Sequence, residues 1–337
     1  MVRATQTEIE AAVEALRAGD LVAFPTETVY GLGANAQNPA ALRKIFEAKG
    51  RPPHHPLIVH LDSVKYLHRW TRKMTPEAEK LAARFWPGPL TLVVPKAPHV
   101  LDAVTGGQDT IAIRVPGHPM AQQLLTAFGG GIAAPSANRY GRLSPTRAEH
   151  VRDELGDAVK IVLDGGECPV GIESTIVSCV ENPVRLLRQG AVTLSQLRGA
   201  VGDVVVGADP SSPRVPGSTL AHYAPVTPLE IVAGDALEIF AGSLNDQGER
   251  VAVLAMRLPL RTLPLVTWIN AGRKPQMYAH NLYSHLRTLD KAGCAKILVQ
   301  EVPADERWDA IRDRLQKAAA SNAAMDEMSG ASSGVLP

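Results

Sequence analysis

Apolar positions in the first part of the chain predict alternating helices and short strands. An amphipathic helix is indicated by a stripe that recurs every three or four residues, Ile9, Ala12, Val13 and Leu16. Thr7 and Glu10 would form its capping box, and Gly19 would close it. Short apolar runs bounded by Pro, Gly or polar residues predict strands at 21–24, 57–61, 90–94, 110–115, 160–163 and 175–177.

Further helices are predicted where a side chain that can cap a helix stands directly before a proline. Asn38-Pro39, Thr75-Pro76 and Ser144-Pro145 have this pattern, because proline suits the first helical turn. Several of the predicted strands are separated by too little chain for a helical crossover. The pattern therefore predicts an α/β domain with a mixed sheet.

A second, smaller domain is predicted after a break in the periodicity between 202 and 228. Pro210, Pro213, Pro216 and Gly217 give that stretch the composition of a linker. Beyond it, strand-like 229–232, 251–256 and 296–300 alternate with helical 277–292 and 308–319, as in a three-layer α/β unit. The predicted division is a first domain at 1–205, a linker at 206–228, a second domain at 229–320 and a small, polar, disordered tail at 321–337.

Composition narrows the class of protein. The 337 residues carry 35 basic and 34 acidic side chains, so the formal charge of +1 provides no global attraction for nucleic acid or anionic membrane. Cys168, Cys179 and Cys294 show no paired metal spacing, and an odd number of cysteines fits a reducing cytoplasm. No apolar run has the length of a membrane span, and no Gly-Lys pair provides a P-loop.

The first predicted strand ends in a polar, glycine-containing turn. Pro25 stops the strand, and the turn that follows combines hydroxyls, a carboxylate and a phenol before a helix begins at Asn38. A strand-loop-helix unit of this kind places its loop at the edge where α/β proteins bind ligands. Residues 31–36 also fit a loose dinucleotide fingerprint, which would indicate a nicotinamide-dependent dehydrogenase. The acidic residue expected about 20 positions later is missing, so a tight turn without nucleotide is an equal alternative.

Two cations flank Gly50 at the end of the helix that follows. Lys49 and Arg51 could answer the helix dipole, or they could clamp a triphosphate just before the next strand. Because they lie at a helix end beside a glycine, we expect both side chains to be exposed.

An arginine interrupts the apolar strand at 110–115. Alternation places Ile111, Ile113 and Val115 on the core face and leaves Arg114 on the other. Its guanidinium needs a partner there, either a neighbouring carboxylate in a structural ion pair or the carboxylate of a substrate held by a bidentate clamp.

Histidine and serine residues near these segments allow further interpretations. His54 and His55 lack a third ligand nearby, so we predict no metal site and expect His55 to be a neutral hydrogen-bond donor. Ser144 is expected to cap the helix opened by Pro145, at an end that could also bind an anion. Neither Ser136 nor Ser174 has the context of a catalytic nucleophile.

Four segments together carry a resemblance to a known family. They are Phe24–Gly33, Lys49–Pro52, Ala134–Asn138 with Ser144–Thr146, and Glu173–Thr175. The order and the residues of these segments resemble the Sua5/YciO/YrdC family, specifically its two-domain Sua5 type. The resemblance spans about 7–197, continues through Pro216-Gly217 and 222–225, and is fainter beyond.

This resemblance implies both a fold and an activity. The fold would be a YrdC-like twisted mixed sheet with helices, followed by a linker and a smaller Rossmann-like Sua5 domain. The activity would be that of an L-threonylcarbamoyladenylate synthase, a nucleotidyltransferase that uses L-threonine, bicarbonate or CO2, and ATP, and releases pyrophosphate. Mg²⁺ would arrive with the ATP, and a separate transferase would use the product to modify tRNA adenosine.

The resemblance also implies site residues, without identifying a catalytic base. ATP would be bound by Lys49, Arg51, His55, Thr110, Ser136, Asn138, Ser144, Arg188 and Tyr223. L-threonine would be bound by Thr28, His60, Arg114, Ala134 and Ser174.

Two departures from the family pattern leave alternatives open. An Asn-like residue is commoner before the proline that corresponds to Pro56, and the family often carries lysines between Gly217 and His222-Tyr223. The segment from Val215 to Pro225 is therefore either a lid over ATP or a plain tether.

An RNA-binding module with a weak tRNA contact is the alternative function, although the chain is only 4% aromatic and offers no stacking platform.

Overall fold

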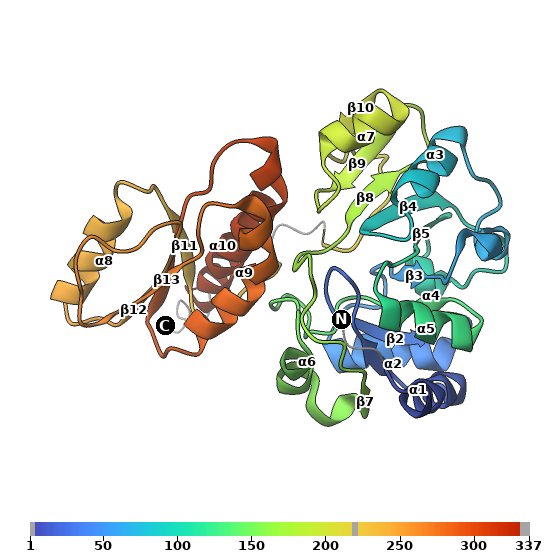
Figure 1. Cartoon of the computed structure of the whole chain (residues 1–337), viewed down its shortest axis with the longest axis horizontal. Helices are drawn as coiled ribbons and strands as arrows, with labels where there is room; N and C mark the ends of the chain where they lie inside the picture. The colour runs from blue at the N-terminus through green and yellow to red at the C-terminus, as the bar shows by residue number, and fades with distance from the viewer. Residues whose placement is uncertain (1–3, 218–221, 331–337) are drawn as a thin grey trace, which may run out of the picture. The chain divides into compact units, whose positions relative to one another are not determined.

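The chain divides into two units, which are described separately (Figure 1). The computed structural model describes residues 4–217 and 222–330, with side chains up to Ser321. The first unit contains residues 1–140 and 144–218, and the second contains 141–143 and 219–337.

The first unit is built on one mixed sheet of ten strands, in the order β10-β9-β8-β4-β5-β3-β6-β2-β1-β7. β4 pairs antiparallel with β5 and parallel with β8, which confirms the predicted mixed sheet. The strands are β1 Val22–Phe24, β2 Gly31–Asn35, β3 Ile58–His60, β4 Leu90–Pro95, β5 Thr110–Arg114, β6 Ile132–Ala133, β7 Ile161–Val162, β8 Thr175–Ser178, β9 Val184–Arg188 and β10 Val204–Val206.

Helices cover this sheet and enclose two apolar cores. Ala23 of β1 packs in the main core, whereas Val22 and Phe24 pack with α1 and α5 in the second core, as alternation along a strand requires. The helices are α1 Gln6–Ala18, α2 Pro39–Lys49, α3 Pro76–Phe85, α4 Asp102–Thr105, α5 Pro119–Phe128, α6 Ala148–Leu155 and α7 Leu194–Val201, with 3-10 turns η1 Val64–Arg69 and η2 Gly156–Ala158.

The helix starts confirm some of the predicted caps and correct others. Asn38 caps α2 and Thr75 caps α3, each followed by proline. The capping box of α1 is formed by Thr5 and Glu8, not by Thr7 and Glu10. Both Thr-x-x-Glu pairs fit the capping-box motif, and a helix that starts at the earlier pair gains additional intrahelical hydrogen bonds.

The second unit has four parallel strands in the order β11-β14-β12-β13. They are β11 Leu229–Val232, β12 Val251–Ala255, β13 Val266–Asn270 and β14 Lys296–Gln300, with helices α8 Leu237–Asp246, α9 Pro275–Asp290 and α10 Asp309–Gly330 and the 3-10 turn η3 Glu306–Trp308. Every residue of β12 is buried, because helices lie on both faces of the sheet (Figure 1). This is the predicted three-layer unit.

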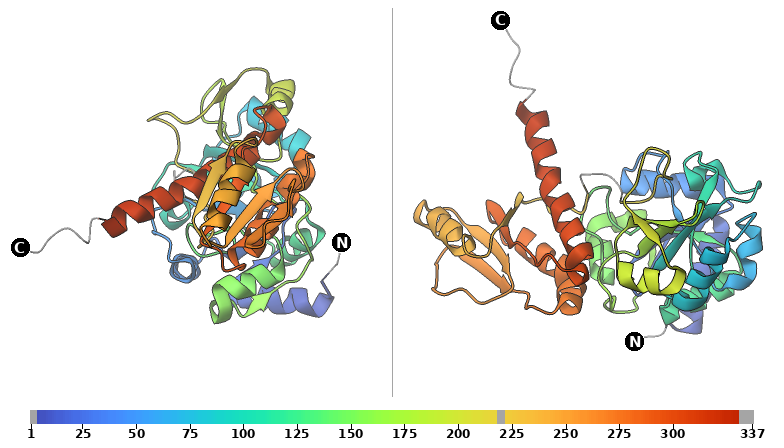
Figure 2. Two further views of the ribbon diagram at one scale, coloured as in Figure 1. Left: turned by 90° about the vertical axis from the view of Figure 1, so that its left-hand side faces the viewer. Right: turned by 90° about the horizontal axis from the view of Figure 1, so that it is seen from above.

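The domain edges differ in detail from the prediction. β10 ends at Val206 and completes the edge of the first sheet, just inside the predicted linker. Residues 218–221 of that linker lie outside the described residues. α10 is helical to Gly330 (Figure 2), so it includes part of the predicted tail, in keeping with the high helix propensity of its alanines; residues 331–337 lie outside the described part. Among the described residues, no helix has the length and apolarity needed to cross a membrane.

Candidate active site

The polar turn after β1 leads into a second strand, not directly into a helix. β2 pairs antiparallel with β1, and α2 begins only after β2. A side chain at Gly33 would place its Cβ 2.8 Å from the Phe24 ring and 2.9 Å from Ile132. The glycine therefore permits close packing within a strand and does not form the phosphate loop of a dinucleotide site. The dehydrogenase interpretation is wrong for this segment.

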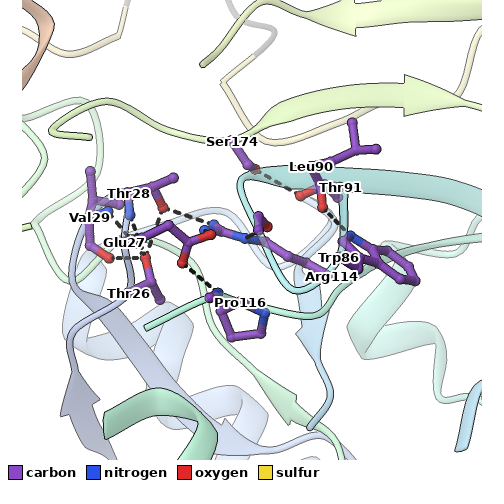
Figure 3. Close-up of polar contacts among 12 residues, drawn as sticks. Thr26, Glu27, Thr28, Val29, Trp86, Leu90, Thr91, Arg114, Pro116 and Ser174 are labelled. Carbon is purple, nitrogen blue, oxygen red and sulfur yellow. Dashed lines mark hydrogen bonds and ion pairs between the residues drawn. The ribbon is translucent and has the colours of Figure 1, made fainter. Parts of the chain in front are cut away.

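Thr26 shapes the turn between β1 and β2. Its hydroxyl donates to the Val29 carbonyl at 2.7 Å and accepts the backbone N–H groups of Thr28 and Val29, each at 3.2 Å. These local bonds replace a strand ladder that Pro25 interrupts. They fix the turn so that the side chains of Glu27 and Thr28 point towards Arg114 (Figure 3).

Arg114, at the end of β5, has partners on all three guanidinium nitrogens. Nη1 donates to the Thr28 hydroxyl at 2.8 Å, Nη2 lies 2.8 Å from the Glu27 carboxylate, and Nε donates to the Gly88 carbonyl at 3.3 Å. The ion pair with Glu27 is therefore the structural ion pair considered for this arginine, and the Arg114 side chain is only 4% exposed. Three contacts leave one further N–H on each terminal nitrogen. Its contact with a substrate carboxylate stays a prediction.

Arg188, at the end of β9, ties Ser174 to the chain that leaves the first unit. Its Nε and Nη2 donate to the carbonyl and hydroxyl of Ser174 at 3.0 and 3.1 Å, and its Nη1 donates to Pro216 at 2.9 Å. The Ser174 hydroxyl also lies 2.8 Å from that of Thr91 (Figure 3). The predicted ATP residue Arg188 and the predicted threonine residue Ser174 are therefore direct neighbours.

Lys49 is buried, contrary to the expectation that it would be exposed. It is 3% exposed, and its side-chain nitrogen donates to the carbonyls of Ser136 and Asn138 at 2.6 and 2.5 Å. Burial and the charge of Arg51 lower the pKa of Lys49 well below its usual value. The helix end is not a surface feature, because the segment around Ser136 folds back over it.

Arg51 and His55 lie in the loop that follows. Arg51 is also buried, at 7% exposed, and donates to the Pro56 carbonyl at 2.9 Å. The His55 ring packs edge-on against Tyr140, with ring centres 5.4 Å apart. Burial, assisted by the charges of Arg51 and His54, lowers the pKa of His55 to about 4. His55 is therefore neutral near pH 7, in keeping with the expected neutral hydrogen-bond donor.

Ser144 does not cap a helix. α6 begins at Ala148, after Arg147, and the Ser144 hydroxyl instead donates to the carboxylate of Glu173. Both groups are buried. The capping prediction fails because a buried acceptor competes for the hydroxyl, and this contact joins two of the four segments that carry the family resemblance.

The remaining predicted residues of the first unit lie on or beside the same sheet. His60 is buried at the end of β3, where burial and the charge of Arg114 lower its pKa to about 3. Ala134 follows β6 and donates its N–H to Ile58 at 2.9 Å, and Thr110 begins β5. The sheet face that carries Arg114 also has a small apolar cluster, formed by Ile58, Val93, Ala112, Ile176 and Val215.

Tyr223 belongs to the second unit. Its side chain is buried there, 6.1 Å from the Tyr283 ring and 5.1 Å from the Arg314 guanidinium, measured to ring centres. Its backbone φ is +62°, a conformation that is uncommon for residues other than glycine. Its assignment to ATP stays a prediction.

Comparison with known proteins identifies the family. A family model described as telomere recombination, Sua5_yciO_yrdC, matches residues 14–190, and a threonylcarbamoyl-AMP synthase C-terminal domain model matches residues 192–320. The chain belongs to the Sua5/YciO/YrdC family. The resemblance seen in the sequence, including its two-domain Sua5 type, is confirmed.

Curated relatives and solved structures extend over nearly the whole chain. The threonylcarbamoyl-AMP synthase of Pyrococcus abyssi is 38% identical over 94% of this chain and 95% of its own length, and that of Bacillus subtilis is 40% identical over 93% of each. The crystal structure of P. abyssi Sua5 complexed with L-threonine matches at TM-score 0.88 and 38% identity, covering 95% of this chain and 96% of that one. The YrdC-like and Sua5 folds are thus confirmed.

Two side chains of this site received no role from the sequence. Thr91 lies on the non-core face of the apolar strand β4, where a hydroxyl needs a partner. Glu27 is the carboxylate of the first segment, and its contact with Arg114 joins positions 87 residues apart in the chain (114 − 27). The signal in each case was a polar residue at the edge of an apolar run, but the partner is set by the fold.

Proposed function

We propose that this protein synthesises L-threonylcarbamoyladenylate from L-threonine, bicarbonate or CO2, and ATP, with release of pyrophosphate. The observation that carries the proposal is the match to threonylcarbamoyl-AMP synthases through both units, with 38–40% identity to the P. abyssi and B. subtilis proteins. A Sua5 structure that matches at TM-score 0.88 is a complex with L-threonine, which supports this amino acid as a substrate.

In this proposal L-threonine lies beside Arg114. The two N–H groups that Arg114 does not use within the protein would hold the threonine carboxylate. Thr28 contacts the guanidinium, Ser174 and Ala134 would complete the threonine site, and His60 would contribute a neutral ring because its pKa is about 3. A neutral histidine adds no second cation, so the amine of threonine would meet no additional repulsion.

The chemistry requires two steps that depend on position and charge. The threonine amine adds to carbon dioxide and loses a proton, giving a carbamate; when bicarbonate is the source, a water molecule leaves in the same net step. A carbamate oxygen then attacks the α-phosphate of ATP in line, and pyrophosphate leaves. Arg51, His55, Ser136, Asn138, Ser144 and Arg188 would contact the nucleotide, while Thr110 would line its site. Charge neutralisation by the arginines lowers the barrier without a protein nucleophile.

Mg²⁺ would enter with ATP and neutralise charge on its phosphates. Among residues 4–217 and 222–330, no group of three His, Cys, Asp or Glu side chains is arranged to hold a metal ion, so its ligands would come mainly from the nucleotide. The product would pass to a separate tRNA threonylcarbamoyl transferase in the cytoplasm. Cys168, Cys179 and Cys294 are not joined in disulfides, which suits that reducing compartment.

Pyrophosphate release tests the proposal. The purified protein is incubated with Mg-ATP, and L-threonine and bicarbonate are added singly and together. We expect pyrophosphate only with all substrates, and incorporation of labelled bicarbonate into an acid-labile adenylate. ATP hydrolysis to ADP that is indifferent to threonine would refute the activity.

A further inference from the structure

The carboxylate of Glu27 links Arg114 to a second backbone donor. One oxygen lies 2.8 Å from Arg114 Nη2, and the other accepts the N–H of Gly117 at 2.9 Å. The residue is 9% exposed, so water provides little competition for either contact. Glu27 thereby connects the β1–β2 turn to the segment that follows β5 (Figure 3).

We propose that Glu27 is a positioning residue that aims the Arg114 guanidinium at the carboxylate of L-threonine. The inference rests on the proposed function and adds a residue to it. Glu27 holds Nη2, Thr28 holds Nη1 and Gly88 holds Nε. These three contacts fix the guanidinium plane before substrate arrives, which reduces the ordering cost of binding.

A carboxylate is the side-chain group that fits between these partners. Both Arg114 and the Gly117 N–H are donors, and an ionised carboxylate presents an acceptor to each. Glutamine has nearly the same shape but carries one acceptor and one donor. Glu27→Gln must therefore lose one contact and place its NH2 group against a donor, which releases the guanidinium without leaving a cavity.

Charge and position make opposite predictions for this variant. Glu27 repels a substrate carboxylate, so removal of its charge alone would tighten L-threonine binding. Loss of Arg114 alignment would weaken it. We expect alignment to dominate because the two fork contacts need correct geometry, and the KM for L-threonine should rise about tenfold while the KM for ATP stays within about twofold.

The second unit provides a matched control. Glu238 is 8% exposed, lies 3.0 Å from Arg257 Nη1 and accepts the N–H groups of Leu260 and Arg261. Glu238→Gln makes the same chemical change in a buried acid between donors. It should lower the melting temperature as Glu27→Gln does and leave both KM values unchanged.

A double-mutant cycle separates positioning from a general loss of structure. Pyrophosphate release and threonine calorimetry are measured for wild type, Glu27→Gln, Arg114→Lys and the double variant. If Glu27 acts through Arg114, Glu27→Gln should change threonine affinity less than twofold in the Arg114→Lys background. Additive effects, an equal rise in both KM values, or tighter threonine binding in the single variant would overturn the inference.

The wild-type measurement distinguishes this inference from the proposed function. Absence of threonine-dependent pyrophosphate in wild type would refute the function itself. Threonine-dependent turnover with an unchanged threonine KM in Glu27→Gln would refute only the role of Glu27. If Glu27→Gln does not fold, Glu27→Asp is used in the same cycle, because it keeps the charge and withdraws the carboxylate by one methylene.

Discussion

The side-chain nitrogen of Lys49 lies 2.5 Å from the carbonyl oxygen of Asn138. It also donates to the Ser136 carbonyl, and the Lys49 carbonyl accepts the N–H of Tyr140 at 2.7 Å. The end of α2 is thus bonded to three positions of one segment. Lys49 orders the part of the chain that carries two of the residues assigned to ATP.

Lys49→Met should therefore affect both folding and nucleotide binding. The buried carbonyl of Asn138 and the partly buried carbonyl of Ser136 would lose their donor, so we expect the free energy of unfolding to fall by about 1–3 kcal/mol. The KM for ATP should rise as the segment loosens. Urea unfolding and steady-state kinetics test this, with Lys44→Met as the control because Lys44 lies on the same helix in an exposed ion pair with Asp20. Normal stability with weak ATP binding would instead indicate a direct phosphate contact alone.

Arg114→Lys should weaken L-threonine binding by about 1.5–3 kcal/mol and change ATP binding little, because an ammonium cannot form the planar fork of a guanidinium. Lysine also cannot keep the contacts with Thr28, Glu27 and Gly88 at once. Calorimetry with each ligand separates the two effects. Unaltered threonine affinity would show that the ion pair with Glu27 is the whole role of Arg114.

Local pattern was sufficient to predict the strand that carries Arg114. Ile111, Ile113 and Val115 pack in the main core, and Ala112 packs on the opposite face, as alternation indicated. Two-residue periodicity is a property of the strand itself. Helix starts at Asn38 and Thr75 were predictable for the same reason, because a cap and its proline are sequence neighbours.

The contacts inside the site could not be predicted in this way. Lys49 is buried by a segment about 90 residues away, and the Ser144 hydroxyl is drawn from the helix end by Glu173. Each outcome depends on which distant group occupies the neighbouring space. The family resemblance identified the residues, but their partners had to come from the fold.

The depressed pKa of His60 should make folding stability depend on pH. Its pKa is about 3 in the folded protein and about 6.5 when unfolded, so the unfolded chain binds the proton more readily between these values. This contribution is fully present above pH 6.5 and decreases by about 1.4 kcal/mol per pH unit as the pH falls below it. The free energy of unfolding is measured in urea for wild type and His60→Gln at pH 7, 6 and 5. The wild-type value minus the variant value should decrease as the pH falls. A pH-independent value would contradict a depressed pKa for His60.

The linker should be anchored to the first unit by Gln108. Its side-chain amide donates to the Arg214 carbonyl at 3.1 Å and accepts the Arg214 N–H at 2.7 Å, as a neighbouring strand would. Gln108→Ala should make trypsin cleavage after Arg214 several-fold faster.

If the segment from Val215 to Pro225 is a lid, ATP and L-threonine together should slow that cleavage in wild type. Equal rates in all conditions would indicate a plain tether.

Gly190 packs directly against the backbone around Ser174, and its replacement should disturb the threonine site selectively. A Cβ at this position would lie 2.3 Å from the backbone nitrogen of Thr175, 2.6 Å from the carbonyl oxygen of Glu173 and 2.6 Å from the carbonyl carbon of Ser174. Because these are backbone atoms, Gly190→Ala must displace the segment that holds the Ser174 hydroxyl.

We expect that displacement to lower stability by about 1–3 kcal/mol and to raise the KM for L-threonine more than the KM for ATP. Gly199→Ala is the control, since Gly199 lies within α7 and a Cβ there meets no other atom within 4 Å. That change should leave kinetics unaltered and stabilise the helix by about 0.5–1 kcal/mol. Denaturant unfolding with kinetics on both variants decides the matter. If Gly190→Ala lost stability but kept its threonine KM, Ser174 would not contact the amino acid.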